Sequence, residues 1–355
     1  MARAIVAIPA KYKEYLEEEL TLVKTLYDIH DYFLVKKPNR QYYIPYTRLE
    51  ELKNTDTYDV LVILDKLKPR YTINLYRELR KEIIDRVQLI LKIFAEHAGS
   101  KEARLQIELA RLKHELPLIR EVIRHMKLGE LPGFLGGGRY AVDKYYRMAK
   151  SRIARIMREL EKQRSLRSLR RAHRRKLGLP HVALVGYTCA GKTTLFNYFT
   201  NNMKPVGPEP FTTLSPKASA IEINGEKIVL VDTVGFIRDI PPEIIEAFYA
   251  TLEEIIDSEL IVLILDASRG LQNIIMELNE SRKILSSIGV HGKPIIIAIN
   301  KIDKIHTNDL HEIIDSVKKS VGEDTPVVPI SALKGYNLDK LAEEMLTRVV
   351  KTIVK

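Results

Sequence analysis

The sequence predicts an α/β protein in three parts: a small N-terminal α/β unit, a long antiparallel helical hairpin, and a doubly wound α/β domain. Three observations support this fold class. Short apolar runs alternate with helical patterns over residues 1–70, an apolar seam with seven-residue spacing lies within 74–178, and strand and helix patterns alternate after residue 178. Because 355 residues are enough for two domains, we place these at 1–178 and 179–355.

The composition, with 45% hydrophobic and 29% charged residues, is typical of a folded protein and excludes a mostly disordered or collagen-like chain. No apolar run approaches the roughly 20 residues that a membrane-spanning helix needs, and the first residues lack the apolar stretch of a secretory signal. The single cysteine, Cys189, excludes an internal disulfide and a cysteine-based zinc site. We therefore expect a cytoplasmic protein.

The first part shows three short strand patterns, at 3–8, 32–36 and 60–64, and a helical pattern at 12–27. These segments carry no cluster of Asp, His or Glu with a recognisable spacing, so we assign no chemistry to them. From Asn74 onward we expect a helix. Its apolar residues are Leu75, Leu79, Ile83, Val87, Ile90 and Phe94.

A second apolar seam predicts the first arm of the hairpin, because its residues are spaced alternately by four and three positions, as in coiled-coil packing. Pro117 should kink that helix. The breaker-rich residues 129–138 separate it from a second helix with Ile153, Ile156 and Leu160 on one face. The glycines of this loop either give a flexible connection or let its backbone approach a ligand or partner closely. The seam consists of Leu105, Leu109, Leu112, Leu116, Ile119, Ile123 and Met126.

Positive charge is concentrated in the second arm of the hairpin. Residues 139–178 hold 15 Lys and Arg against three acidic residues, while the whole chain carries a net charge of +11. The rest of the chain is therefore close to neutral. This density of charge favours a polyanionic partner, nucleic acid before membrane, over a merely solvated helix face.

The C-terminal domain is predicted to contain six strands, separated mostly by helical patterns, which is typical of a doubly wound sheet. Asn224-Gly225 joins the one tight pair of strands, so we expect a hairpin that places an antiparallel strand at the sheet edge. The predicted strands are 181–185, 218–223, 227–231, 260–265, 294–299 and 326–330.

A phosphate-binding loop lies between the first of these strands and the next helix. Gly186-Tyr-Thr-Cys-Ala-Gly-Lys-Thr193 matches the spacing G-x-x-x-x-G-K-[ST] in the required setting of strand, loop and helix. Backbone N–H groups of such a loop surround the β-phosphate, Lys192 reaches the β and γ oxygens, and the Thr193 hydroxyl binds magnesium. The predicted nucleotide contacts are Gly186, Tyr187, Thr188, Cys189, Ala190, Gly191, Lys192, Thr193 and Thr194.

Two further segments complete the predicted magnesium and γ-phosphate site. In Asp232-Thr-Val-Gly235, the carboxylate of Asp232 can hold Mg²⁺ and the N–H of Gly235 can meet the γ-phosphate. Between the first two strands, Thr212 or Thr213 should supply a second magnesium hydroxyl, and we favour Thr213. The predicted metal ligands are Thr193, Thr213 and Asp232, and the predicted catalytic residues are Lys192, Thr213 and Gly235.

Base recognition is predicted at the ends of the last two strands. The carboxylate of Asp303 can accept hydrogen bonds from N1–H and the exocyclic amine of guanine, and Lys301 can lie over the base. The N–H of Ala332 can donate to guanine O6, where adenine would present a donor, so GTP is preferred over ATP. The predicted base-binding residues are Asn300, Lys301, Asp303, Ser331, Ala332 and Leu333. With the phosphate loop, they predict a Ras-like doubly wound P-loop GTPase domain.

The residue after Gly235 departs from the pattern of many GTPases. A glutamine that orients the attacking water commonly stands there, but this chain has Phe236, whose phenyl ring cannot polarise water. We therefore expect slow intrinsic hydrolysis, accelerated by a partner that orders the nucleotide-sensing segments or supplies a group.

Several stretches resemble one family of GTPases. Asp232-Thr-Val-Gly-Phe236 and Pro210-Phe-Thr-Thr-Leu-Ser215 are similar to the third motif and the first switch of HflX proteins, in the Obg-HflX branch of translation-factor-related GTPases. Residues 84–95 and 105–112 resemble that family's N-terminal domain, an α/β unit followed by two long helices. The resemblance implies ribosome binding through this domain, chiefly to the large subunit near the peptidyl-transferase region, with roles in ribosome splitting or stress response.

Two positions depart from the family's pattern: 136–143 replaces the usual Glu-Thr-Gln-Leu-Glu continuation, and Cys189 stands where asparagine is usual. We expect a monomer whose basic hairpin segment, 139–178, binds ribosomal RNA. One alternative is an RNA-binding or RNA-remodelling module regulated by a GTPase domain. Another is a GTPase that docks to a membrane surface or a protein through the hairpin, although the positive helix lacks the band of large apolar side chains typical of membrane-surface helices.

Overall fold

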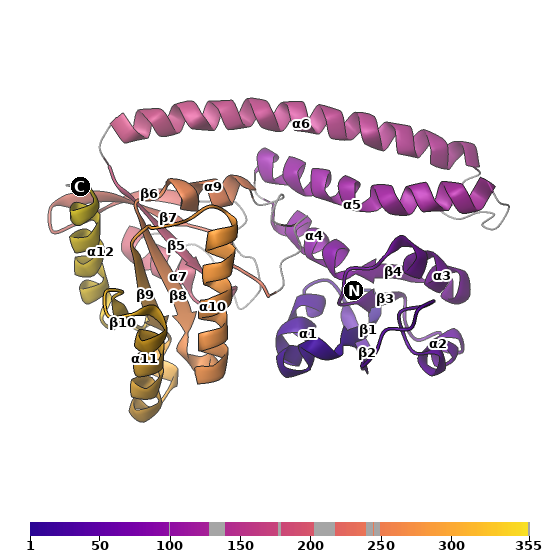
Figure 1. Cartoon of the computed structure of the whole chain (residues 1–355), viewed down its shortest axis with the longest axis horizontal. Coiled ribbons are helices and arrows are strands. Elements are labelled where there is room, and N and C mark those ends of the chain that lie inside the picture. Colours follow the sequence, from indigo (N-terminus) through magenta and orange to yellow (C-terminus); the bar gives the residue numbers. More distant parts are fainter. Residues whose placement is uncertain are drawn as a thin grey trace. The chain divides into compact units, whose positions relative to one another are not determined.

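The computed structural model describes residues 1–98, 100–127, 139–176, 179–201, 217–238, 244 and 249–353. The chain divides into two compact units (Figure 1), one of Met1–Gln163 with Pro241–Ala247 and one of Arg164–Ile240 with Phe248–Lys355. Among the described residues, no helix combines the length and the apolar character required to cross a membrane.

The first unit begins with a four-stranded parallel sheet of strand order β2-β1-β3-β4. Parallel neighbours need crossover connections, and helices supply them between successive strands. The central strand β3 is buried along its whole length, as expected for a parallel sheet with both faces covered. The elements are β1 (Arg3–Pro9), a 3₁₀ turn (Ala10–Tyr15), α1 (Leu16–Lys24), β2 (Asp28–Val35), α2 (Tyr46–Lys53), β3 (Val60–Ile63), α3 (Pro69–Leu79), β4 (Glu82–Asp85) and α4 (Arg86–His97).

The prediction of one continuous helix after Asn74 is wrong, because the strand β4 separates α3 from α4. α3 ends at Leu79, and Arg80 adopts a left-handed conformation with φ 53° and ψ 27°, which terminates the helix. The strand then pairs with β3, and the side chain of Asp85 restarts the helical pattern by accepting from the backbone N–H of Gln88 at 2.9 Å. The apolar spacing fits a helix equally well, so only sheet pairing distinguishes the two.

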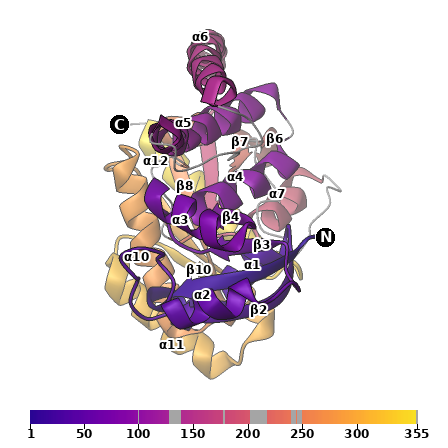
Figure 2. The ribbon, with the colours of Figure 1, turned by 90° about the vertical axis from the view of Figure 1, so that its right-hand side faces the viewer.

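The helical hairpin is confirmed for its described residues. α5 (Lys101–Lys127) and α6 (Arg139–Lys176) lie side by side in both ribbon views (Figures 1 and 2). Their direction is antiparallel, because Lys101 near the start of α5 pairs with Glu159 at 2.5 Å, whereas Glu108 further along pairs with Arg152 at 2.7 Å. The glycine-rich loop at 129–138 lies outside the described residues.

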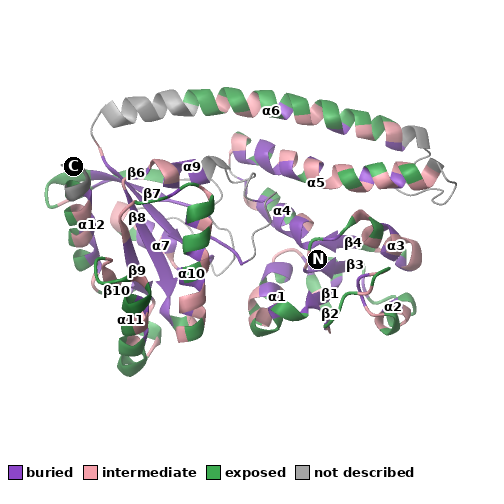
Figure 3. Ribbon diagram, in the orientation of Figure 1, coloured by how far each residue is buried: buried purple, intermediate pink, exposed green. Residues whose placement is uncertain are grey.

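Apolar side chains fill the seam between the two arms of the hairpin. One cluster joins Leu105 and Leu112 of α5 to Ala149 and Ile156 of α6. The seven-residue repeat of the sequence places these side chains on facing stripes. The opposite face of α6 is exposed along much of its described length (Figure 3).

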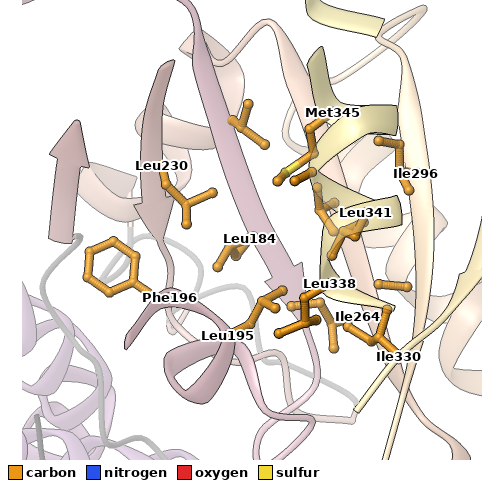
Figure 4. Packing of buried hydrophobic residues seen from close by; sticks show 14 of the residues in the cluster. Leu184, Leu195, Phe196, Leu230, Ile264, Ile296, Ile330, Leu338, Leu341 and Met345 are labelled. Atoms are coloured by element: carbon orange, nitrogen blue, oxygen red, sulfur yellow. The ribbon is translucent and has the colours of Figure 1, made fainter. Parts of the chain in front are cut away.

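The second unit contains a six-stranded sheet of order β10-β9-β8-β5-β7-β6, parallel except for the edge strand β6. The predicted strands and the predicted hairpin at Asn224-Gly225 are therefore confirmed. α7 and α12 pack on the sheet through Leu195, Phe196, Leu341 and Met345 (Figure 4). The elements are β5 (His181–Gly186), α7 (Lys192–Thr200), β6 (Lys217–Ile223), β7 (Glu226–Asp232), α9 (Tyr249–Asp257), β8 (Leu260–Asp266), α10 (Leu271–Ser287), β9 (Ile295–Asn300), α11 (Thr307–Val321), β10 (Val327–Pro329) and α12 (Leu338–Ile353).

The seam of the hairpin gives a first testable prediction. Ile156 is 0% exposed, so Ile156→Ala leaves a cavity and should lower the free energy of unfolding by about 2–5 kcal/mol. Met157, its neighbour on the same helix, is 52% exposed, and Met157→Ala should change that energy by no more than about 0.5 kcal/mol. Urea unfolding followed by circular dichroism measures both; equal effects would show that α5 does not pack on this face of α6.

Candidate functional site

The phosphate loop connects the end of β5 to the start of α7, and its backbone requires glycine at two points. A side chain at Gly186 would place Cβ 2.3 Å from the carbonyl oxygen of Ile264 on the neighbouring strand. At Gly191, where φ is +100°, Cβ would lie 2.2 Å from Nδ2 of Asn300. These close approaches explain why the motif has glycine at these two positions.

Lys192, the first residue of α7, is only 7% exposed and lies inside the curve of the loop. Its Nζ donates to the carbonyl oxygens of Gly186 at 3.1 Å and Tyr187 at 2.7 Å. Burial lowers the pKa of this ammonium to about 8, while the nearby Asp232 carboxylate acts in the opposite direction. A buried cation surrounded by a curved backbone is suited to binding a phosphate group.

Next to Lys192, an oxygen pair forms where α7 begins and β7 ends. The Thr193 hydroxyl donates to Oδ2 of Asp232 at 3.0 Å, and both residues are buried. One hydroxyl and one carboxylate fit Mg²⁺, which prefers oxygen ligands and is usually held by few protein groups together with phosphate oxygens. Within the described ranges, no group of three or more His, Cys, Asp or Glu side chains is arranged to hold a metal.

Gly235 lies directly against the phosphate loop. A Cβ at this position would be 2.9 Å from Cα of Thr188 and 3.0 Å from Nζ of Lys192. Phe236 continues the contact through its backbone: its N–H donates to the carbonyl of Gly186 and its own carbonyl accepts from the N–H of Thr188, both at 2.9 Å. Thr212 and Thr213 lie outside the described residues.

The predicted base-binding loops are tied together by Asn300, at the end of β9. Its Nδ2 donates to the carbonyl of Ala190 at 2.8 Å, and its Oδ1 accepts from the N–H of Ala332 at 2.9 Å. Oδ1 of Asp303 accepts from the Ser331 hydroxyl at 2.5 Å. The structure thus brings the phosphate loop and both predicted base loops together at the carboxyl edge of the sheet, where open α/β sheets bind ligands.

The remaining predicted contacts lie at the margins of this arrangement. Lys301 adopts a left-handed conformation with φ 65°, and its Nζ lies 2.6 Å from the carboxylate of Asp266. Cys189 likewise has a positive φ, 62°, and burial raises the pKa of its thiol. Leu333 is 72% exposed, and Thr194 lies in the first turn of α7.

Sequence reasoning missed residues that hold the loops in place. Asp266 ends β8 and fixes Lys301; the rule that ligand sites lie at the carboxyl ends of parallel strands could have found it. Arg269 donates to the carbonyl of Thr188 at 3.1 Å and to the buried carboxylate of Glu277 at 2.6 Å. Arg269 and Glu277 belong to no sequence motif, so they could not be predicted; their role depends on how α10 packs beside the phosphate loop.

Three family models match the chain. One described as a 50S ribosome-binding GTPase matches residues 181–301, which include the phosphate loop and Asn300. A GTP-binding GTPase middle region matches 97–174, and a GTP-binding GTPase N-terminal region matches 13–95. Together these models match most of both compact units.

Similar proteins cover nearly the whole chain. GTPase HflX of Saccharolobus solfataricus is 46% identical over 345 residues, covering 94% of this chain and 95% of that protein. GTPase HflX of Methanocaldococcus jannaschii is 38% identical, covering 93% and 82% respectively. A crystal structure of a GTP-binding protein from Sulfolobus solfataricus in complex with GDP is 38% identical, covers 99% of each chain, and has a TM-score of 0.54. A complex of SsGBP and GDP, also 38% identical with 99% of each chain covered, has a TM-score of 0.58. This chain is therefore a GTP-binding and GTP-hydrolysing member of the HflX family of GTPases.

Proposed function

We propose that this GTPase is a ribosome-bound switch, which attaches to the large subunit and its RNA through the basic N-terminal part and acts in ribosome splitting or stress response. The observation that carries the proposal is a basic stripe on the exposed face of α6. The description of the matched model as a 50S ribosome-binding GTPase supports the same partner. On this proposal the protein works as a monomer in the cytoplasm.

The stripe lies opposite the buried seam of the hairpin. Ala149 and Ile156 point into the seam, so residues about half a helical turn away from them face solvent. Successive members of the stripe are three, eight, three and four positions apart, which keeps them on one side of the helix. The α6 stripe consists of the exposed residues Lys144, Arg147, Arg155, Arg158 and Lys162.

This geometry suits the phosphate backbone of RNA. At about 1.5 Å per residue, Lys144 and Lys162 are about 27 Å apart, so the stripe can contact several successive phosphates. Acidic side chains of the helix are partly engaged elsewhere, since Glu159 pairs with Lys101 of α5. Between residues 142 and 166, the part of α6 whose side chains are described, the large exposed apolar residues are Tyr145, Met148, Met157 and Leu166, too few for a continuous apolar band, which favours RNA over a membrane surface.

In the nucleotide site, the proposed roles are those predicted from the sequence. Lys192 binds the β- and γ-phosphates, and Thr193, Thr213 and Asp232 hold Mg²⁺ together with phosphate oxygens. The N–H of Gly235 binds the γ-phosphate, which would explain its position beside Lys192. The base-binding residues are those at the ends of β9 and β10: Asn300, Lys301, Asp303, Ser331, Ala332 and Leu333.

Intrinsic hydrolysis is proposed to be slow. Phe236 is buried and is held to the phosphate loop by two backbone hydrogen bonds, so its side chain offers no polar group to an attacking water. A partner that reorders this segment or inserts a polar side chain would raise the rate.

The state of Lys192 makes nucleotide binding sensitive to pH. The free ammonium has a pKa of about 8, and bound phosphates favour the charged form, so binding above that pH must take up a proton. GTP affinity should be constant below pH 7.5 and fall by about tenfold per pH unit above pH 8. Fluorescence titration with a labelled GTP between pH 7 and 9 measures this. Lys192→Arg, whose guanidinium does not titrate in this range, should give a flat profile; a flat wild-type profile would contradict the expectation.

Because Phe236 cannot orient the attacking water, the rate of GTP hydrolysis should depend on the partner. Phosphate release under single-turnover conditions should be at least about tenfold faster when 50S subunits are present, because the ribosome would reorder the segment after Gly235 or insert a polar side chain. Ribosomal proteins freed of RNA, and free tRNA, serve as controls for non-specific stimulation of hydrolysis. A rate that no ribosomal particle changes would contradict this expectation.

The α6 stripe predicts how binding responds to charge. The double variant Arg155→Glu/Arg158→Glu should weaken co-sedimentation with ribosomes by at least about tenfold at low salt and flatten its dependence on salt concentration. Lys318→Glu/Lys319→Glu on the exposed face of α11 makes the same change in net charge and should leave binding close to wild type. Equal losses in both variants would mean that net charge alone matters. Binding to free RNA that ignores the nucleotide state would favour an RNA-binding module instead.

A further inference from the structure

A carboxylate on α10 lies between two parts of the nucleotide site. The hydroxyl of Tyr187, the second residue of the phosphate loop, donates to Oε2 of Glu280. Nη1 of Arg238, three residues after Gly235, lies 3.8 Å from Oε1 of the same side chain. The two oxygens of one carboxylate therefore contact the phosphate loop and the segment that follows Gly235.

Both partners of Glu280 are deeply buried, while Glu280 itself is partly exposed, with 26% of its side chain accessible. Burial raises the pKa of the Tyr187 phenol, and the neighbouring Glu280 carboxylate raises it further, so the hydroxyl remains a donor. Nη1 of Arg238 also donates to the sulfur of Met276, one turn before Glu280 on α10. Tyr187 and Arg238 thus hold fixed positions along one helix.

A second carboxylate of α10, that of Glu277, also stabilises the phosphate loop, but through another residue. Glu277, one turn earlier, pairs with Arg269, which donates to the carbonyl of Thr188 in the phosphate loop. That arrangement stabilises the loop by itself. Glu280 contacts the phosphate loop directly and also the segment that follows Gly235, and Gly235 itself lies beside Lys192.

We propose that Glu280 is a positioning residue for GTP hydrolysis, which holds the segment from Gly235 to Arg238 against the phosphate loop by contacting Tyr187 and Arg238 together. The two backbone bonds of Phe236 fix the start of this segment, and the ion pair fixes its end. Only three peptide units separate Gly235 from Arg238, so displacement of the guanidinium shifts the Gly235 N–H. This role of Glu280 rests on the proposed function, in which the Gly235 N–H binds the γ-phosphate of GTP; GDP has no γ-phosphate for that N–H to bind.

The test separates the two contacts of Glu280 in the full-length protein, without ribosomes. Glu280→Gln keeps an oxygen that accepts from Tyr187 and removes the charge opposite Arg238. We expect single-turnover GTP hydrolysis to fall about fivefold, which is typical for loss of a partly exposed ion pair, with GDP affinity within about twofold of wild type. Arg238→Gln should give the same loss, Arg238→Lys should restore most of the rate, and the double variant should be no slower than either single variant.

Glu312→Gln on the exposed face of α11 is the matched control, because it removes the same charge at a position that contacts neither loop, and its rate should equal wild type. Tyr187→Phe should weaken GDP and GTP binding alike, since it releases the loop itself. Unchanged hydrolysis in Glu280→Gln would overturn the proposal. So would additive losses in the double variant, or a loss of GDP affinity and thermal stability equal to the loss of rate, because these results describe a purely structural contact.

Discussion

The burial of one ammonium group is the constraint on which the nucleotide site depends. Lys192 begins α7 with its charge enclosed, and a buried lysine is costly unless oxygens surround it. The carbonyls of Gly186 and Tyr187 supply those oxygens only because the backbone curls tightly around Nζ. That curl in turn needs glycine at both ends, where β8 and Asn300 leave no room for a side chain. The position of β5 in the middle of the sheet brings these neighbours together.

In the helical hairpin, α6 carries many positive charges that repel one another, and it must nevertheless stay helical. One side of α6 is anchored by an apolar seam and by ion pairs to α5, such as Glu108 with Arg152. That anchoring offsets the mutual repulsion of the basic residues on the other side, which remain available to a polyanion. The low apolar content of α6 is therefore consistent with a stable helix, because its partner helix supplies the packing that it lacks in isolation.

Much of this molecule could be predicted from the sequence, because its strongest patterns are local. Four strands of the second unit, β5, β7, β8 and β9, contain buried runs of aliphatic and β-branched residues, and the phosphate loop is a contiguous motif. β4 could not be distinguished from helix, because Ile83 and Val87 fit a helical period and only pairing with β3 decides. Asp266 and Glu280 were missed because their contacts join segments far apart in the sequence. The domain boundary at 178 and the role of Thr213 stay predictions.

The amide of Asn300 donates to one loop and accepts from another, so the phosphate loop and a predicted base-binding loop are cross-linked through a single side chain. Because these loops are already held relative to each other, binding of a nucleotide between them costs less entropy of loop ordering. An aspartate at this position would offer acceptors alone and would face the carbonyl of Ala190 with a repulsive contact. An amide side chain at the end of β9, in place of a carboxylate, thus keeps the two loops preorganised for nucleotide binding.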